Sequence, residues 1–146
     1  KVGDNFKLFD FIKELELNVD KLKMDKEMIH RSINMGFSGG ERKKNEILQM
    51  YMLKPSFVIL DEIDSGLDVD SLKTVGNNVM DYYNEYKPLM IVITHYQRLL
   101  DYIKPDYVHI LKNGSIVKSG DSSLVKEIEE KGYDNISSTS IMKDNL

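Results

Sequence analysis

Two short apolar runs stand out in the pattern of hydrophobic and polar positions, at residues 57–60 and 89–93. Each is continuous and bounded by turn residues, which is the pattern of a buried parallel strand. Between them, residues 68–83 carry apolar side chains at helical spacing, and Asp68 is a good N-cap for that helix. Helices that alternate with apolar strands predict an α/β fold with a parallel sheet.

The segment before the first strand is predicted to be helical. Residues 41–53 place apolar side chains on one helical face, and Lys54-Pro55 ends that helix. The charged segment 5–35 has imperfect helical spacing, which predicts short helices with a break near residues 18–20.

The segment after the second strand is predicted to contain a hairpin between two helices. The expected elements are, in order, a short helix (97–103), two strands (107–111 and 115–118) and a helix (122–131). Asn113-Gly114 is the strongest short hairpin signal, and Gly132 stops the last helix. The polar segment 137–146 is predicted to be a flexible tail.

Composition narrows the class of protein. The 146 residues are 41% hydrophobic and 30% charged, as in soluble globular domains. The net charge of −4 gives no support to a nucleic-acid partner, and no apolar run approaches the roughly 20 residues of a membrane span. The absence of cysteine excludes iron–sulfur ligation by thiolates of this chain. The absence of alanine and the excess of lysine over arginine suggest an AT-rich genome.

Asp61-Glu62 is the first candidate for chemistry. The pair ends an apolar strand, and open α/β sheets bind ligands at the carboxyl ends of their strands. Asp61 is suited to hold Mg²⁺ and Glu62 to polarise an attacking water. On these residues alone, two solvated acids at a strand end explain the pattern equally well.

Ser38-Gly39-Gly40 comes directly before the helix that begins at Glu41. Two glycines let a backbone approach a phosphate closely, and the N–H groups of a helix N-terminus favour an anion. Alone, this pattern is better explained as a turn at the start of a helix.

His95 directly follows the second strand, where it is placed to donate a hydrogen bond to a phosphate. A lone histidine is more often a core or loop residue. His30 and His109 take that ordinary interpretation, and the three histidines have no metal-binding spacing.

Taken together and in this order, the motifs resemble the signature, Walker B, D-loop and H-loop of an ATP-binding-cassette (ABC) ATPase. The match is most specific for the SufC family, the ATPase subunits of the Suf iron–sulfur cluster assembly system. The stretches that carry the resemblance are Gly36-Phe37-Ser38-Gly39-Gly40-Glu41, Asp64-Ser65-Gly66-Leu67-Asp68, Thr94-His95-Tyr96-Gln97-Arg98 and Pro105-Asp106-Tyr107-Val108. No G-x-x-x-x-G-K-[ST] phosphate loop occurs in the chain, so we expect it to correspond to a C-terminal part of such an ATPase.

The resemblance implies a role for each motif. Asp61 would support Mg²⁺, Glu62 would act as the general base, and His95 would contact the γ-phosphate of ATP. Residues 38–41 (Ser38, Gly39, Gly40 and Glu41) would contact ATP held by a second subunit in an ATP-dependent homodimer. Asp68 would couple the two sites.

The resemblance also implies an organisation and partners. Residues 1–36 would end a helical subdomain, and residues 37–136 would belong to the ATPase core, in which helices flank parallel strands and a β-hairpin is terminal. The expected partners are the SufB and SufD scaffold proteins, with no nucleic acid and no direct membrane insertion. A plastid stroma, in particular the apicoplast, is the expected compartment, with the cytoplasm as the alternative. Two other functions stay open: the ATPase subunit of an ABC transporter, or a non-catalytic partner-binding module for this chain alone.

Arg42-Lys43-Lys44 raises one further hypothesis. A short turn joins the helix 41–53 to the strand that precedes Glu62, so the two should run antiparallel. Lys43 or Lys44 would then reach Glu62 and hold it away from water in a resting subunit. A solvated basic helix face is the ordinary alternative.

Overall fold

The computed structural model describes residues 7–132, so the predicted tail at 137–146 lies outside the described residues. The chain divides into two units, residues 1–102 and residues 103–146, and each is described by itself. None of the helices in the described part is both long enough and apolar enough to cross a membrane.

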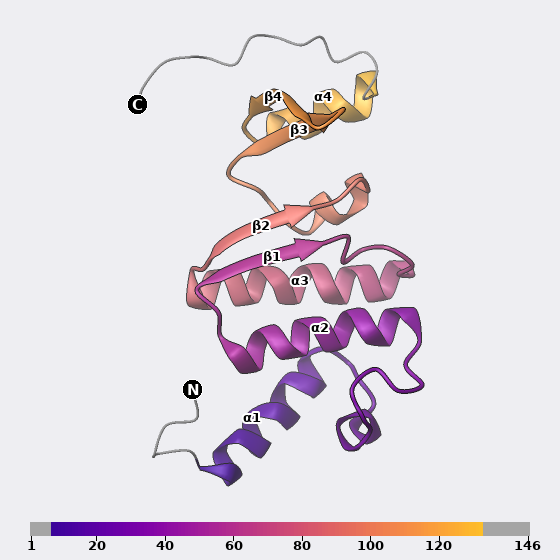
Figure 1. The fold of residues 1–146 in the computed structure, drawn as a ribbon, viewed down its shortest axis with the longest axis vertical. Coiled ribbons are helices and arrows are strands. Elements are labelled where there is room, and N and C mark those ends of the chain that lie inside the picture. The colour runs from indigo at the N-terminus through magenta and orange to yellow at the C-terminus, as the bar shows by residue number, and fades with distance from the viewer. Residues whose placement is uncertain (1–6, 133–146) are drawn as a thin grey trace. The chain divides into compact units, whose positions relative to one another are not determined.

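A two-stranded parallel sheet forms the centre of the first unit. Strand β1 (Phe57–Asp61) pairs with β2 (Leu89–Ile93) in parallel, with Ile59 opposite Ile91. Helix α3 (Val69–Tyr86) makes the crossover between them (Figure 1). The predicted parallel strands and the helix that links them are confirmed.

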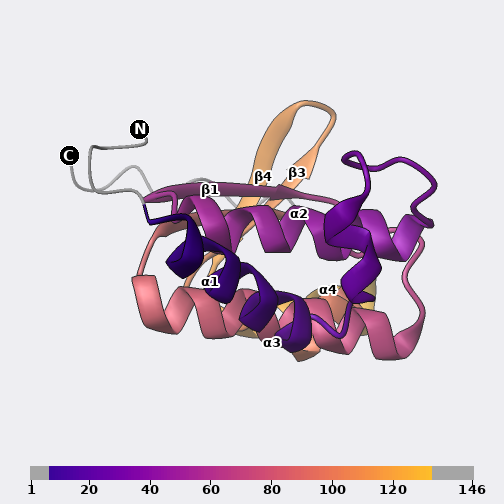
Figure 2. The ribbon, with the colours of Figure 1, turned by 90° about the horizontal axis from the view of Figure 1, so that it is seen from below.

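Helices supply most of the core of this unit. Helix α2 (Gly39–Leu53) lies beside α3, and α1 (Leu8–Lys21) packs against α2 (Figures 1 and 2). The rings of Tyr51 and Tyr82 meet edge to face at 5.4 Å, and the Tyr51 hydroxyl donates to the carbonyl of Asn78 at 2.9 Å. The largest fully buried side chains of the unit are Tyr51, Tyr82, Leu22, Ile47, Ile63, Leu99, Val19, Val75 and Val79.

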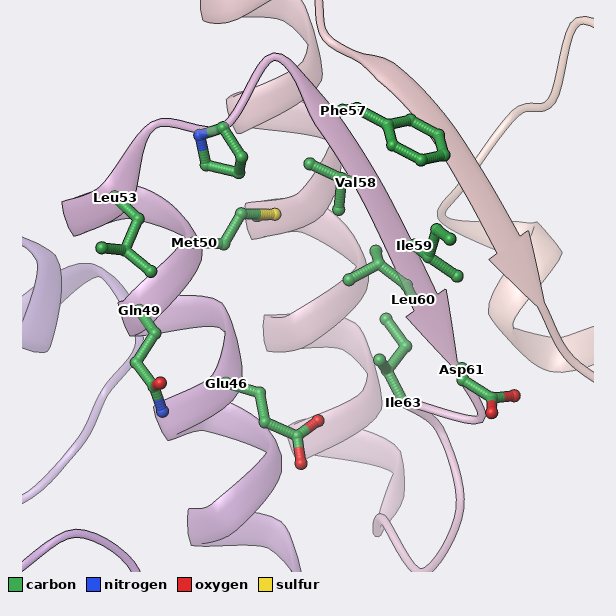
Figure 3. Close-up of a pocket in the computed structure, with 11 residues that line it drawn as sticks. Glu46, Gln49, Met50, Leu53, Phe57, Val58, Ile59, Leu60, Asp61 and Ile63 are labelled. Carbon is green, nitrogen blue, oxygen red and sulfur yellow. The ribbon is translucent and has the colours of Figure 1, made fainter.

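Among the described residues of the first unit, the sheet is covered on one face only, whereas the apolar runs had predicted strands buried on both faces. Val58 and Leu60 are buried and point toward the helices, while Phe57 and Ile59 point away from them (Figure 3). Ile91 is likewise exposed, because alternate residues of a strand face opposite sides. Within residues 7–132, helices α2 and α3 cover one side of the sheet.

The predicted break at residues 18–20 is wrong. Helix α1 runs without interruption to Lys21, and both Asn18 and Val19 are buried. The amide of Asn18 lies 3.6 Å from the sulfur of Met52 on α2. Packing against α2 therefore outweighs the modest helix propensity of these residues. The chain turns only after Leu22, where Lys23 adopts a φ of 50°.

Two short 3₁₀ helices complete the first unit, η1 (Lys26–His30) and η2 (Gln97–Asp101). The second of these replaces the slightly longer helix predicted at residues 97–103.

The second unit is a β-hairpin with one helix. Strands β3 (Val108–Lys112) and β4 (Ser115–Gly120) are antiparallel, and α4 (Ser123–Lys131) follows them. The turn residues Asn113 and Gly114 have φ values of 51° and 76°, which is the conformation that an Asn-Gly hairpin requires. A small apolar cluster formed by Ile110, Leu124 and Ile128 holds the helix against the hairpin. The predicted hairpin and its helix are confirmed.

Substitution of Gly76 by alanine will destabilise the chain, although alanine is the better helix former by about 1 kcal/mol. A Cβ atom at Gly76 would lie 2.6 Å from the Cβ atom of Tyr102, so α3 and the chain after η2 would have to separate. We expect a net loss of about 1–2 kcal/mol in the free energy of unfolding, measured by chemical denaturation. Gly39→Ala is the matched control, since a Cβ atom there meets nothing within 4 Å. A Gly76→Ala chain as stable as the wild type would contradict the close approach.

Candidate functional site

A capping box organises the start of α2. The hydroxyl of Ser38 accepts from the Glu41 N–H at 3.3 Å, and the Glu41 carboxylate accepts from the Ser38 N–H at 2.7 Å. The Ser38 backbone N–H, followed by its hydroxyl, lowers the pKa of Glu41 and keeps this carboxylate ionised. The spacing Ser-x-x-Glu is the sequence signal for this arrangement, and it was not used in predicting the roles of these residues.

The start of α3 lies beside the start of α2. The Asp68 carboxylate caps α3 by accepting from the Ser71 N–H at 2.7 Å, and that hydrogen bond is the main cause of the lowered pKa of Asp68. A Cβ atom on Gly40 would lie 3.6 Å from the side chain of Leu67 and 3.8 Å from the hydroxyl of Ser71. The start of α2, predicted to contact ATP, and the start of α3, predicted to couple two sites, are therefore neighbours in one chain.

A second group of predicted site residues gathers where β1 and β2 end. Asp61 is the exposed last residue of β1, and Glu62 follows in the left-handed conformation with a φ of 47°. The Glu62 N–H donates to the carbonyl of Ile93 at 2.9 Å, which ties the two loops together at their base. The Glu62 carboxylate lies 3.2 Å from Nδ1 of His95, and both side chains are about half exposed. Residues 33 positions apart in sequence are thus in direct contact.

The lysines of α2 do not hold Glu62 in this structure, so the hypothesis of a Lys43 or Lys44 restraint is wrong. Lys43 pairs with Glu46 at 3.4 Å, and the Lys44 ammonium donates to the carbonyl of Lys23 at 3.3 Å. The antiparallel course of α2 and β1 is as predicted, with Glu46 and Asp61 at the same end (Figure 3). Lys43 therefore takes an acceptor on its own helix, Lys44 takes one in the turn after α1, and His95 contacts Glu62 instead.

A shallow pocket of about 330 Å³ lies between α2 and β1 (Figure 3). Its lining is mostly apolar and comes from Glu46, Gln49, Met50, Leu53, Pro55, Phe57, Val58, Ile59, Leu60, Asp61 and Ile63. Asp61 is the single predicted site residue in that lining. Apart from Asp61, the residues predicted to carry chemistry therefore lie outside this pocket.

Two residues to which the sequence analysis gave no role, Asp64 and Thr94, lie in the same loops. The hydroxyl of Thr94 donates to the carboxylate of Asp64 at 2.5 Å, and Asp64 is buried. Asp64 stands two residues after Glu62, and Thr94 directly precedes His95. A carboxylate between the apolar residue Ile63 and a Ser-Gly turn is a weak sequence signal, because the same pattern is common in exposed turns.

Comparison with solved structures gives the fold. MJ1267, an ATP-binding cassette of an ABC transporter, matches in two structures. In its ADP conformation it is 21% identical, with a TM-score of 0.64, over 86% of this chain and 48% of its own. In the second structure it is 20% identical, with a TM-score of 0.66, over 89% and 49% of the two chains.

The fold is part of an ATP-binding cassette. The segments predicted from the sequence to be the Walker B and H-loop motifs lie at the ends of β1 and β2, and the predicted signature lies at the start of α2.

Comparison with curated sequences supports the SufC resemblance. "Probable ATP-dependent transporter SufC" of Escherichia coli is 56% identical over 86% of this chain and 50% of its own length. "Probable ATP-dependent transporter ycf16" of Cyanophora paradoxa is 51% identical over 96% and 52%. "Vegetative protein 296" of Bacillus subtilis is 50% identical over 90% and 50%. The recognition of a SufC-like segment of an ABC ATPase is confirmed, and no protein-family model matches the chain.

The chain spans about half the length of the curated relatives it matches. Activity, substrates and partners belong to the complete proteins.

The side chains near the ends of β1 and β2 include one suitable ligand for Mg²⁺. Within residues 7–132, no group of three or more His, Cys, Asp or Glu side chains could hold a metal ion by itself. Asp61 offers an exposed carboxylate oxygen, which is a ligand that Mg²⁺ prefers. Because Mg²⁺ in nucleotide sites usually takes one or two carboxylates together with phosphate oxygens and water, this single donor fits the ion.

Proposed function

We propose that the complete protein containing this chain is an ATP-hydrolysing subunit of the ABC type. The observation that carries the proposal is the contact between Glu62 and His95, 3.2 Å apart at the ends of two parallel strands and directly after Asp61. A carboxylate and an imidazole placed together at the carboxyl edge of a sheet suit the activation of water beside a phosphate. The sequence and fold relatives support the same reaction class.

The chemistry assigned to each residue follows from its position. Glu62 accepts a proton from the attacking water, whose oxygen forms a bond to the γ-phosphorus while the bond to the β-γ bridging oxygen breaks. His95 donates a hydrogen bond to the γ-phosphate and orients Glu62 through their contact. Asp61 would hold Mg²⁺, which when bound neutralises charge on the phosphate oxygens. The products are ADP and phosphate.

Residues at the start of α2 act on a second copy of the subunit in this proposal. The N–H groups of Gly39 and Gly40 lie at the first turn of the helix, where backbone donors favour an anion. Ser38 and Glu41 hold that turn in shape through the capping box. Asp68, capping the neighbouring helix, connects the start of α2 to the turn that follows Glu62.

The proposed role of ATP hydrolysis is iron–sulfur cluster assembly on a scaffold formed by SufB and SufD. The support is the 56% identity to the relative named SufC. The same relative is also named a transporter, and this favours a second candidate, the ATPase subunit of an ABC transporter. The partner that co-purifies with the complete protein discriminates them: soluble scaffold proteins for the first, a membrane permease for the second.

For the compartment we propose a plastid stroma, the apicoplast in particular, with the cytoplasm as the alternative. The lack of alanine and the excess of lysine support an AT-rich organellar lineage.

The chain alone will hydrolyse no ATP, while the complete protein will do so in the presence of Mg²⁺. No G-x-x-x-x-G-K-[ST] segment occurs in the 146 residues, and that segment supplies the backbone donors and the lysine for the β- and γ-phosphates. Phosphate release and calorimetric ATP binding are measured for both proteins. Release by the chain alone that Glu62→Gln abolishes would show that the phosphate-loop segment is dispensable. A complete protein without activity would overturn the proposed function.

A further inference from the structure

Asp64 is a buried carboxylate in the turn between β1 and α3. Its side chain is 6% exposed, and one oxygen, Oδ2, accepts the Thr94 hydroxyl at 2.5 Å. The other oxygen, Oδ1, is buried with no hydrogen-bond partner among the described residues. Burying a carboxylate is costly unless its hydrogen bonds offset the lost hydration, so this residue differs from an ordinary exposed turn aspartate.

Thr94 connects Asp64 to the next two residues, His95 and Tyr96, and restricts their conformation. Its hydroxyl accepts from the Tyr96 N–H at 2.9 Å, which closes a tight turn around His95. A hydroxyl has one proton, and the short contact assigns that proton to Asp64 rather than to the Tyr96 carbonyl at 3.2 Å. The ring of Tyr96 lies 4.1 Å from the ring of His95, so holding Tyr96 also holds the imidazole.

Asp64 is itself fixed within the turn that joins Glu62 to Asp68. The Leu67 N–H donates to the carbonyl of Asp64 at 3.3 Å, and the Ser65 N–H donates to the carbonyl of Glu62 at 3.1 Å. The Asp64–Thr94 hydrogen bond therefore connects two turns, one carrying Glu62 and the other carrying His95.

We propose that Asp64 is a positioning residue that sets the orientation of His95 through Thr94. The direct contact between Glu62 and His95 cannot do this alone, because a contact between two half-exposed side chains contributes little. A hydrogen bond from a hydroxyl to a carboxylate is about twice as strong as one between neutral groups, and here it is partly buried. The effect of this arrangement on catalysis rests on the proposed function. Its effect on the conformation of residues 94–96 can be measured on the chain itself.

The structural test is hydrogen exchange of the Tyr96 amide in the 146-residue chain. Thr94→Val removes the hydroxyl and keeps the shape, so exchange at Tyr96 should accelerate by about tenfold, as expected for the loss of one hydrogen bond. Thr94→Ser keeps the hydroxyl and should stay within about twofold of the wild type. The Lys87 amide, bonded to the Tyr83 carbonyl at 2.9 Å, reports stability elsewhere in the unit and should not change. Equal acceleration at Tyr96 and Lys87, or none at Tyr96, would overturn the proposal.

Thr94→Val leaves the buried carboxylate of Asp64 without its donor and could unfold the chain for that reason alone. Two variants of Asp64 provide a test that avoids this problem. Asp64→Ala removes that carboxylate altogether, and Asp64→Asn keeps an acceptor for Thr94. The alanine variant should accelerate exchange at Tyr96, and the asparagine variant should protect it nearly as well as the wild type. If the two variants exchange alike, the acceptor is irrelevant and the proposal fails.

The catalytic test uses the complete protein. Thr94→Val should lower kcat for ATP by about 10–100-fold with KM within about twofold, since a misplaced imidazole affects the transition state more than ground-state binding. Thr94→Ser should restore kcat. A wild-type protein without activity would reject the proposed function. The exchange data would still show whether Asp64 holds the turn around His95 through Thr94. An active wild type with an unchanged Thr94→Val variant would reject the role of Asp64 alone.

Discussion

Replacement of Glu62 by glutamine in the complete protein will slow ATP hydrolysis by about 10²–10⁴-fold and leave ATP binding in place. Glutamine keeps the shape of the side chain and cannot accept the proton of the attacking water. The backbone should not move, because the Glu62 N–H bond to Ile93 involves no side-chain atom. With hydrolysis blocked, bound ATP should hold two subunits together as a stable dimer.

The effect of Glu62→Gln is measured by single-turnover hydrolysis and by the mass of the ATP-bound species. Glu46→Gln is the matched control: it makes the same change of charge on the exposed face of α2, where Glu46 pairs only with Lys43 among the described contacts. That variant should hydrolyse ATP at the wild-type rate. A normal rate for Glu62→Gln would mean that another group takes the proton, and it would remove the main support for the proposed mechanism.

The substitution Gly39→Asp will abolish ATP-driven dimerisation of the complete protein and spare ATP binding to the monomer. A side chain at Gly39 meets nothing within 4 Å in the subunit, so an aspartate fits without displacing its own fold. An acid in the first turn of α2 also interacts favourably with the helix dipole. The expected loss therefore comes from the partner's nucleotide, whose phosphates the new carboxylate would repel.

Gly39→Asn separates charge from bulk, because asparagine has nearly the same shape and no charge. If repulsion dominates, the asparagine variant should dimerise measurably better than the aspartate variant. Dimerisation is measured by light scattering with ATP, and monomer binding by calorimetry. Loss of ATP binding by the monomeric Gly39→Asp variant would show that the start of α2 acts on its own subunit's nucleotide.

Local signals in the sequence determined the elements that depend on neighbouring residues alone. The apolar runs at 57–60 and 89–93 became parallel strands, and Asn113-Gly114 became the hairpin turn. Asp68 caps α3, as predicted, because its carboxylate needs only the N–H of a residue three positions ahead. Capping and turn formation are short-range effects, and a buried strand leaves a continuous apolar run in the sequence, so these elements can be predicted from composition and spacing.

The arrangement of the candidate site depended on contacts between distant residues. Spacing alone gave no reason for Glu62 to contact His95 rather than Lys43, and the choice follows from the pairing of β1 with β2. The exposure of Ile59 and Ile91 likewise depends on which face of the sheet the helices cover. Asn18 and Val19 stay helical because α2 packs against them.

The sequence motifs indicated which chemical groups are available to the site. The roles of several of these groups remain predictions for the complete protein. The tertiary structure decided which groups meet: the partly buried bond between Asp64 and Thr94 joins segments 30 residues apart, and no local pattern predicts it. The physical reason is that a side chain's partner is set by strand register and helix packing, which the whole chain determines together.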